Sequence, residues 1–268
     1  MLIPHLEHHR APSLHGGLQA PQPEPRVVPI SDENPTELRP FVTIGLILLN
    51  VYAWFMLQGA GTPQALQASV LHFGTIPCEI TARCAPEGLT TGTIVTAMFM
   101  HGSWEHILGN LLFLWVFGNN IEDSMGHLRF LVFYLLCGAV AAGAHIYFNV
   151  GSELPAVGAS GAISGVMGAY IVLYPHARVR TWLPPIFFFN LRAMFFLMYW
   201  FALQLFMAYV EFGAQAGEEG GVAVWAHVGG FVAGVALVKV FENHTLTRAR
   251  RNKVTLTRAE VAQARPWM

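Results

Sequence analysis

Apolar residues gather in six long runs along this chain, and polar connections separate them. A helix that crosses a bilayer needs about 17 to 25 mainly apolar residues, and each run is close to that length. We therefore expect an all-α polytopic membrane protein whose membrane domain, residues 41–241, is a six-helix bundle. The predicted spans are residues 41–57, 104–121, 128–148, 156–174, 194–210 and 222–241.

The polar connections differ in character. The long one, residues 58–103, combines prolines and glycines with apolar patches, which predicts a structured, membrane-hugging loop with short helices. Cys78 and Cys84 lie close together in it and can pair if the loop faces an oxidising compartment. The connection after the fourth span is basic, and we expect its aromatic patch, residues 186–189, at the membrane interface.

The two ends of the chain are predicted as tails. Residues 1–40 are rich in proline and have no apolar run, so we expect a flexible N-terminal tail. Residues 242–268 form a short basic tail. Arginine and lysine collect on alternate connections, so the positive-inside rule places both termini in the cytoplasm. A bacterial plasma membrane is the favoured location, and an organelle membrane is the alternative.

Composition agrees with a protein that lies in a lipid bilayer. Hydrophobic residues make up 54% of the 268 residues and charged ones only 12%, whereas about a quarter are charged in soluble proteins. The formal net charge of −1 gives no indication of nucleic acid as a partner. Nothing in the sequence indicates a metal or an organic cofactor, and the oligomeric state is not predicted.

Small residues define two flat helix faces. The fourth span opens with the run Gly-Ala-Ser-Gly-Ala-Ile-Ser-Gly, residues 158–165, where a run of large apolar residues would be usual. Glycines three or four residues apart share one helix face and allow two backbones to approach closely. The sixth span repeats this spacing. The glycines expected to pack around the site are Gly158, Gly161, Gly165, Gly230 and Gly234.

Four polar residues fall at one depth near the outer ends of three spans. Ser160 is in the first turn of the fourth span, His227 is at a similar depth in the sixth, and His106 and Asn110 share a face of the second. Each alone is explained by structure, because a serine often bonds back to a carbonyl and an amide or imidazole can join two helices. Unrelated structural polar groups have no reason to match in depth, so the set favours a functional site.

The chemistry of the set is that of acyl transfer. We expect Ser160 to be the nucleophile and His227 its general base and then general acid. No Asp or Glu lies at matching depth, so the sequence predicts a dyad. Donors for an oxyanion are the Ser160 backbone N–H, the Asn110 amide and a ring N–H of His106.

The same residues resemble the motifs of rhomboid intramembrane serine proteases. The motifs are His-Gly-Ser-Trp-Glu-His-Ile-Leu-Gly-Asn, residues 101–110, then Gly-Ala-Ser-Gly, residues 158–161, then Ala-His-x-x-Gly, residues 226–230. The resemblance runs from about Ser31 to Phe241. It implies Ser160 and His227 as catalytic residues, His106 and Asn110 in the oxyanion hole, and transmembrane protein substrates.

Two alternatives stay open at this point. A non-catalytic rhomboid-like protein that binds membrane proteins for quality control would share the fold, and a small transporter would use the polar layer as a solute site. A transporter more naturally carries paired carboxylates or repeated halves, and the sequence has neither. For substrate entry, we expect the bulky fifth span, which has no glycine face, to be the mobile side.

Overall fold

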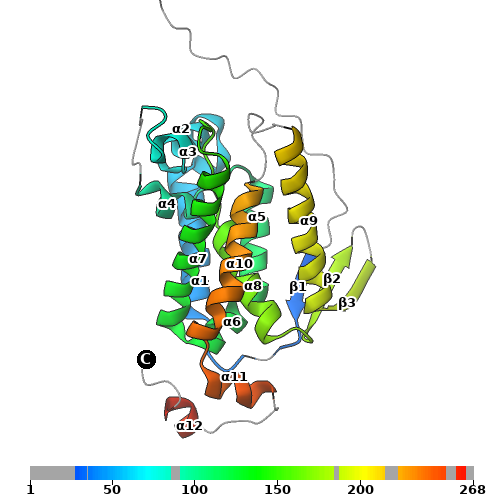
Figure 1. Ribbon diagram of the computed structural model, residues 1–268. Coiled ribbons are helices and arrows are strands. Elements are labelled where there is room, and N and C mark those ends of the chain that lie inside the picture. The colour runs from blue at the N-terminus through cyan, green and yellow to red at the C-terminus, as the bar shows by residue number, and fades with distance from the viewer. Residues whose placement is uncertain are drawn as a thin grey trace, which may run out of the picture.

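The computed structural model describes residues 28–34, 36–85, 91–183, 187–214, 223–251 and 258–263. The fold is mostly helical (Figure 1). Within these ranges, three helices are long and apolar enough to cross a membrane: α7 (His127–Phe148), α9 (Ala193–Ala214) and α10 (Val224–Phe241). Two shorter apolar segments run beside them: α1 (Phe41–Tyr52), continued by a π-helical turn Ala53–Leu57, and α8 (Ser160–Leu173).

The second apolar segment is longer than the sequence predicts. Helix α5 (Trp104–Phe113) continues through a π-helical stretch, Leu114–Gly118, into α6 (Asn119–Met125). It therefore passes the expected end at residue 121, and the added part includes the acidic residues Glu122 and Asp123. Gly126, with φ of +85°, breaks the helix before α7 begins, because a positive φ suits glycine and not other residues.

Short helices crowd one end of the bundle, which we call the loop end (Figure 1). These are α2 (Pro63–Phe73), α3 (Pro77–Ile80) and α4 (Thr93–Thr96), within the connection where short helices are expected. A disulfide joins Cys78 to Cys84 there. Residues 86–90 of this connection lie outside the described residues.

A small antiparallel sheet lies at the opposite end, which we call the sheet end. It is made by β1 (Val28–Asp32), β2 (Arg178–Leu183) and β3 (Phe187–Arg192), in the order β1-β2-β3. Part of the predicted flexible tail is thus a strand, since β1 pairs with β2. Residues 1–27 of that tail lie outside the described part of the chain.

The predicted basic connection folds as the β2–β3 hairpin. Two short helices, α11 (His244–Arg251) and α12 (Arg258–Gln263), follow α10.

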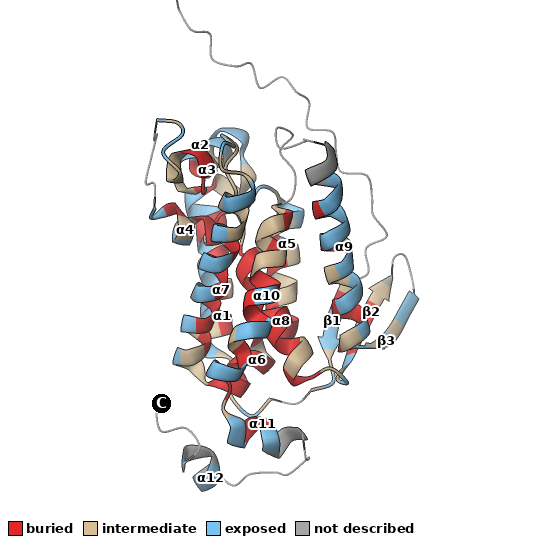
Figure 2. Ribbon diagram, viewed as in Figure 1, coloured by how far each residue is buried: buried red, intermediate tan, exposed pale blue. Residues whose placement is uncertain are grey.

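Helix α8 is the centre of the packing (Figure 2). Its residues from Gly161 to Tyr170 are all buried, whereas α9 is exposed over much of its surface. The predicted glycine faces of α8 and α10 lie against each other. A Cβ on Gly230 would come within 2.0 Å of the Gly161 carbonyl oxygen, and one on Gly234 within 1.9 Å of the Gly165 oxygen. Only glycine permits this backbone contact, which places the two helices close enough for short side chains to meet.

Candidate active site

Ser160 is the first residue of α8, and the backbone before it is extended. Ala156 pairs with Thr75 in an isolated bridge, and Gly158 donates its N–H to the Ala97 carbonyl at 2.9 Å. Gly158 has a φ of +128°, so the helix cannot extend back to Ala156, where the sequence predicts the span to begin. The result is a serine hydroxyl in a first helical turn, where backbone N–H groups lack intrahelical partners.

His227 of α10 reaches this serine directly. Its Nε2 lies 2.8 Å from Ser160 Oγ, and only 8% of its surface is exposed. The contact joins residues 67 positions apart in the sequence. It depends on the close approach of α8 and α10 at their glycines.

A third residue, Gln204 of α9, holds the other ring nitrogen of His227. Gln204 Oε1 lies 2.8 Å from His227 Nδ1, and Gln204 is itself buried. An amide oxygen can only accept, so this contact requires the proton on Nδ1 and leaves Nε2 free to accept from Ser160. The sequence did not predict Gln204 in this role, because only Asp and Glu were considered as partners that could orient His227 at this depth. The signal was present, since Gln204 is an isolated amide in an apolar span.

His106 is held at the first turn of α5. Ser103 caps this helix, and its side chain accepts from the His106 backbone N–H at 3.2 Å. The Gly102 N–H donates to His106 Nδ1 at 3.4 Å, which leaves Nε2 to carry the ring proton. A Cβ built on Gly158 would lie 2.7 Å from His106 Nε2 and 3.5 Å from Ser160 Oγ. Gly158 is therefore needed for space as well as for its φ, and the imidazole lies beside the nucleophile.

Asn110 lies one turn further along α5 and is buried. Its Nδ2 has no hydrogen-bond partner within the described residues. A buried amide without a partner is costly, and such groups in native proteins need an explanation. A donor kept available for a ligand is one such explanation.

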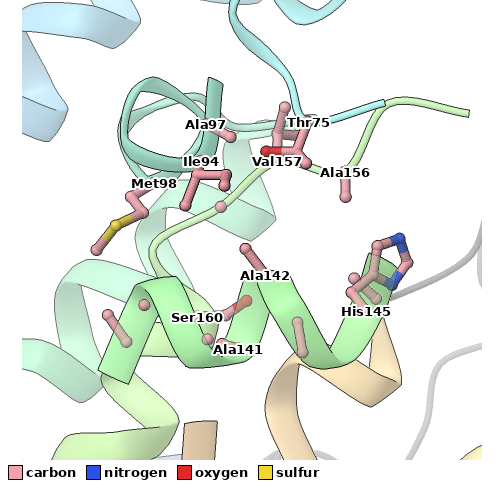
Figure 3. Close-up of a pocket in the computed structure, with 16 residues that line it drawn as sticks. Thr75, Ile94, Ala97, Met98, Ala141, Ala142, His145, Ala156, Val157 and Ser160 are labelled. Atoms are coloured by element: carbon pink, nitrogen blue, oxygen red, sulfur yellow. The ribbon is translucent and has the colours of Figure 1, made fainter. Parts of the chain in front are cut away.

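A cavity of about 40 Å³ adjoins Ser160 (Figure 3). Ala141 and Ala142 of α7 form one wall, and Ile94 and Met98 of the loop end lie across from them. A water molecule needs about 10–15 Å³ by this measure, so the cavity has room for water or for a small side chain. Among the described residues, no group of three or more His, Cys, Asp or Glu side chains could hold a metal ion.

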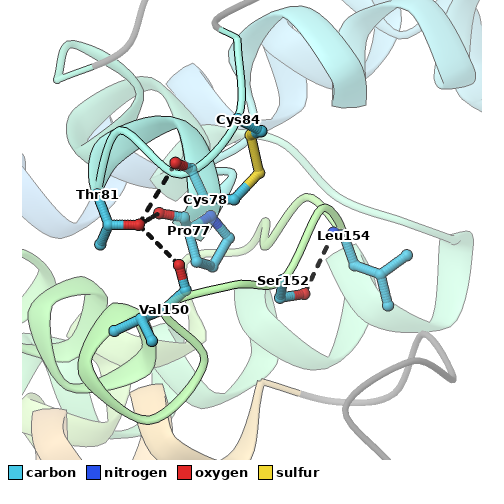
Figure 4. Close-up of a disulfide and its surroundings, with 7 residues drawn as sticks. All are labelled: Pro77, Cys78, Thr81, Cys84, Val150, Ser152 and Leu154. Carbon is cyan, nitrogen blue, oxygen red and sulfur yellow. Dashed lines mark hydrogen bonds between the residues drawn. A yellow bond between two sulfur atoms is a disulfide. The ribbon is translucent and has the colours of Figure 1, made fainter.

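The disulfide loop is hydrogen-bonded to the connection that precedes α8 (Figure 4). The Cys78 N–H donates to the Ser152 carbonyl at 3.0 Å, and the Thr81 hydroxyl donates to the Val150 carbonyl at 2.7 Å. Both carbonyls belong to the connection between α7 and α8. The bridge from Cys78 to Cys84 therefore stiffens a loop that packs against the approach to the candidate nucleophile.

Comparison with known proteins places these residues in a family. The family model described as the Rhomboid domain matches residues 90–243, more than half of the chain. The chain is 28% identical over 148 residues to the human mitochondrial presenilin-associated rhomboid-like protein, which covers 54% of this chain and 36% of that protein.

Two further relatives come from other compartments. Rhomboid-like protein 11 of the Arabidopsis thaliana chloroplast is 34% identical over 79 residues, which is 30% of this chain and 28% of the relative. Rhomboid protease GluP of Bacillus subtilis is 37% identical over 78 residues, which is 29% of this chain and 15% of the relative. The chain thus matches about a third or less of the length of these relatives, and the family match makes it a multi-pass membrane protein. The chain belongs to the rhomboid family.

Proposed function

We propose that this protein is an intramembrane serine endopeptidase that hydrolyses peptide bonds in or near the transmembrane segments of other membrane proteins. The observation that carries the proposal is the 2.8 Å contact between Ser160 Oγ and His227 Nε2 inside the apolar bundle. A nucleophile within hydrogen-bond reach of a base, with that base oriented by a third group, is the geometry of nucleophilic catalysis.

Acylation would proceed as follows. His227 Nε2 takes the hydroxyl proton of Ser160 while Oγ forms a bond to the substrate carbonyl carbon. The protonated His227 then gives that proton to the amine as the C–N bond breaks. Water enters in place of the amine, and its oxygen bonds to the acyl carbon while His227 takes a water proton. His227 then gives this proton to Ser160 Oγ as the ester bond breaks and the acid leaves. In both half-reactions, Gln204 holds Nδ1–H and keeps Nε2 directed at the serine.

The oxyanion formed on the substrate carbonyl needs donors that are already in position. His106 Nε2 lies beside Gly158 and Ser160, and the Asn110 amide has a donor that no described residue accepts. The backbone N–H at the start of α8 is the third donor. Removing one such donor from a known hydrolase costs about 10²–10³ in kcat.

The proposed topology has six transmembrane segments, in which the shorter α1 and α8 and the continuous α5–α6 segment also cross the membrane. Residues 1–40 and 242–268 are then cytoplasmic tails, and the loop end faces outward. The Cys78–Cys84 bridge supports this orientation, because disulfides persist in oxidising compartments and are rare in the cytosol. A bacterial plasma membrane with its outer face toward the periplasm or cell exterior satisfies these conditions.

Substrate would enter beside α9. This helix has large side chains in place of a glycine face, and it packs on α10 through rings such as Phe201 on Phe231, with centroids 4.4 Å apart. Side-chain packing of this kind is more easily separated than backbone contact between glycines. Because Gln204 is also on α9, displacement of this helix would loosen His227 until the substrate is seated and the helix has returned.

The test is cleavage of a single-span model substrate by the purified full chain in liposomes. Wild type is compared with Ser160→Ala and His227→Ala, and a fluorophosphonate probe labels the reactive serine in parallel. We expect cleavage to be lost in both variants and labelling to require Ser160. Folded wild-type protein that neither cleaves nor labels would contradict the peptidase and leave a rhomboid-like membrane-protein binding factor.

A further inference from the structure

The β2–β3 hairpin at the sheet end has two unlike faces. On β2, Val179 and Thr181 are fully buried against the bundle, whereas Arg178 and Arg180 are exposed. Side chains alternate between the faces of a strand, so the arginines share the outward face. The register places Arg192 opposite Arg178.

This outward face carries three arginines. Within the ranges that the structure describes, none of the three arginines forms an ion pair with a carboxylate. A nearby acid is Glu33, whose Oε1 accepts from Asn190 Nδ2 at 3.4 Å on the same face. Three guanidinium groups on one exposed face, with one carboxylate at the edge, leave a local excess of positive charge.

Aromatic rings extend the same hairpin beyond the arginines. Phe187 and Phe188 are 61% and 56% exposed, and Trp182 pairs with Phe188 across the strands in a stacked arrangement. The Arg180 guanidinium lies 5.7 Å from the centre of the Phe188 ring. Such a cluster of exposed rings on a protein surface marks contact with an apolar partner.

The position of the hairpin identifies that partner. Figure 1 shows β2 and β3 standing beside the first half of α9, not beneath the bundle. The arginine end of β3 continues directly into α9 at Ala193, and the aromatic end lies farther from that junction. Phe195, in the first turn of α9, is 55% exposed. With α9 as a transmembrane helix, this arrangement would place the rings at the level of the membrane and the arginines at its edge.

We propose that the outward face of the β2–β3 hairpin is a binding site for the headgroups of anionic phospholipids in the leaflet at the sheet end. Guanidinium groups bind phosphate oxygens in paired hydrogen bonds, and aromatic rings settle at the boundary between headgroups and acyl chains. Arg178, Arg180 and Arg192 hold the phosphate, and the rings keep the hairpin against the bilayer. The lipid so held lies next to α9 and does not depend on the peptidase activity.

Native mass spectrometry of the full-length protein tests this site. Protein is purified in mixed micelles that contain equal amounts of phosphatidylglycerol and phosphatidylcholine, and the retained lipids are counted. Wild type is expected to retain phosphatidylglycerol in preference. A basic residue at an anionic surface contributes about fivefold in affinity, so Arg178→Gln/Arg180→Gln should lower retention by about 25-fold. Arg178→Lys/Arg180→Lys keeps the charge and should retain most of the lipid.

A matched control makes the same change of charge elsewhere. Arg83 lies at the loop end and Arg129 on α7, so Arg83→Gln/Arg129→Gln removes two positive charges away from the hairpin. Its lipid retention should equal that of wild type. Equal retention of the two lipids by wild type, or an equal loss in both glutamine variants, would overturn the proposal. Displacement of the lipid by millimolar inorganic phosphate would also overturn it, because the site would then be one for free phosphate.

Discussion

Both ends of the bundle bury polar side chains, and the buried carboxylates of α6 differ in their hydrogen bonds from the residues around the candidate site. The contrast is limited to these groups, because Asn120 Oδ1 near the sheet also lacks a partner within the described residues. At the sheet end, the fully buried Glu122 carboxylate accepts from the Val42 and Thr43 N–H groups at 2.9 and 2.8 Å and from the Thr43 hydroxyl at 2.7 Å, and it also contacts His127. The neighbouring Asp123 accepts from the N–H groups of Glu37 and Leu38. These carboxylates fix the start of α1 to the end of α6.

At the loop end, a buried donor of the candidate site has no acceptor in the part of the chain that the structure describes. This donor is Asn110 Nδ2. His101 is also fully buried there. Burial lowers the pKa of His101 to about 3, so its ring is neutral. A polar group whose bonds are all made internally stiffens a structure, whereas one left open in an apolar site is available to a ligand. Burial of a polar group in a membrane protein is therefore not itself a sign of function, and the state of its hydrogen bonds is more informative.

The largest expected effect is a loss of catalysis when the hydroxyl oxygen of Ser160 is removed. Ser160→Ala should lower kcat by about 10⁴-fold or more, because no nucleophile remains. The melting temperature in mild detergent should stay within about 2 °C of wild type, since only one atom leaves a roomy site beside a cavity. A large loss of stability would mean that the loop end is as structural as the sheet end.

Glu122→Gln makes a similarly small change at the sheet end and should have the opposite result. The amide places N–H donors where backbone N–H groups need acceptors, so the free energy of unfolding should fall by about 3 kcal/mol. Activity per folded molecule should change little, because the site is at the other end of the bundle. Unfolding in detergent and titration of active serine with the fluorophosphonate probe measure the two quantities.

Thr43→Val is the matched control for that experiment. It removes only the hydroxyl donor to Glu122 and keeps the backbone bonds, so a loss of about 1 kcal/mol is expected. An effect as large as that of Glu122→Gln would show that packing around Thr43, and not the carboxylate, holds α1.

Gln204→Ala tests whether α9 orients the base, and its expected effect is smaller. Loss of the acceptor frees His227 to adopt the wrong tautomer, which should lower kcat by about 10–100-fold with little change in KM. Gln204→Glu keeps an acceptor oxygen and should restore most of the rate, whereas Gln204→Leu should not. Labelling by the small fluorophosphonate probe should slow in parallel, because it does not require a substrate helix to enter. Unchanged labelling in Gln204→Ala would limit Gln204 to the packing of α9.

Much of the loop end could be predicted from the sequence because its signals are local. Glycine spacing indicates which faces of α8 and α10 approach each other. Ser160 and His227 lie at a similar depth in their spans, which is enough to predict that their side chains meet. Gln204 could not be paired in this way, because the rotation of α9 about its axis is set by bulky rings and not by a glycine face. The exact start of α8 also escaped prediction, since it depends on the φ of Gly158.

The sheet end was harder to predict. The alternation Arg-Val-Arg-Thr-Trp-Leu in residues 178–183 is a strand pattern. The segment was nevertheless predicted as a connection between two spans, because it is basic. The partner strand β1 lies about 150 residues earlier in a proline-rich stretch, and no local pattern links the two. Glu122 and Asp123 follow the last predicted residue of their span, so their burial became visible only in the packed structure.

Asp32→Asn is expected to have an effect that appears only as pH is varied, and it tests the exception to the comparison. Asp32 of β1 accepts from the Tyr170 hydroxyl and from Asn120 Nδ2, yet burial outweighs these donors and raises its pKa to about 6. Because the folded pKa is above the ordinary value of 3.8, the wild-type protein should gain stability as pH falls from about 6 to about 4. The asparagine variant lacks this dependence, so the difference in unfolding free energy between the two proteins should change by about 2 kcal/mol across that range. A difference that stays constant from pH 4 to pH 8 would mean that Tyr170 and Asn120 compensate the buried charge fully, and Asp32 would then join Glu122 among the satisfied carboxylates.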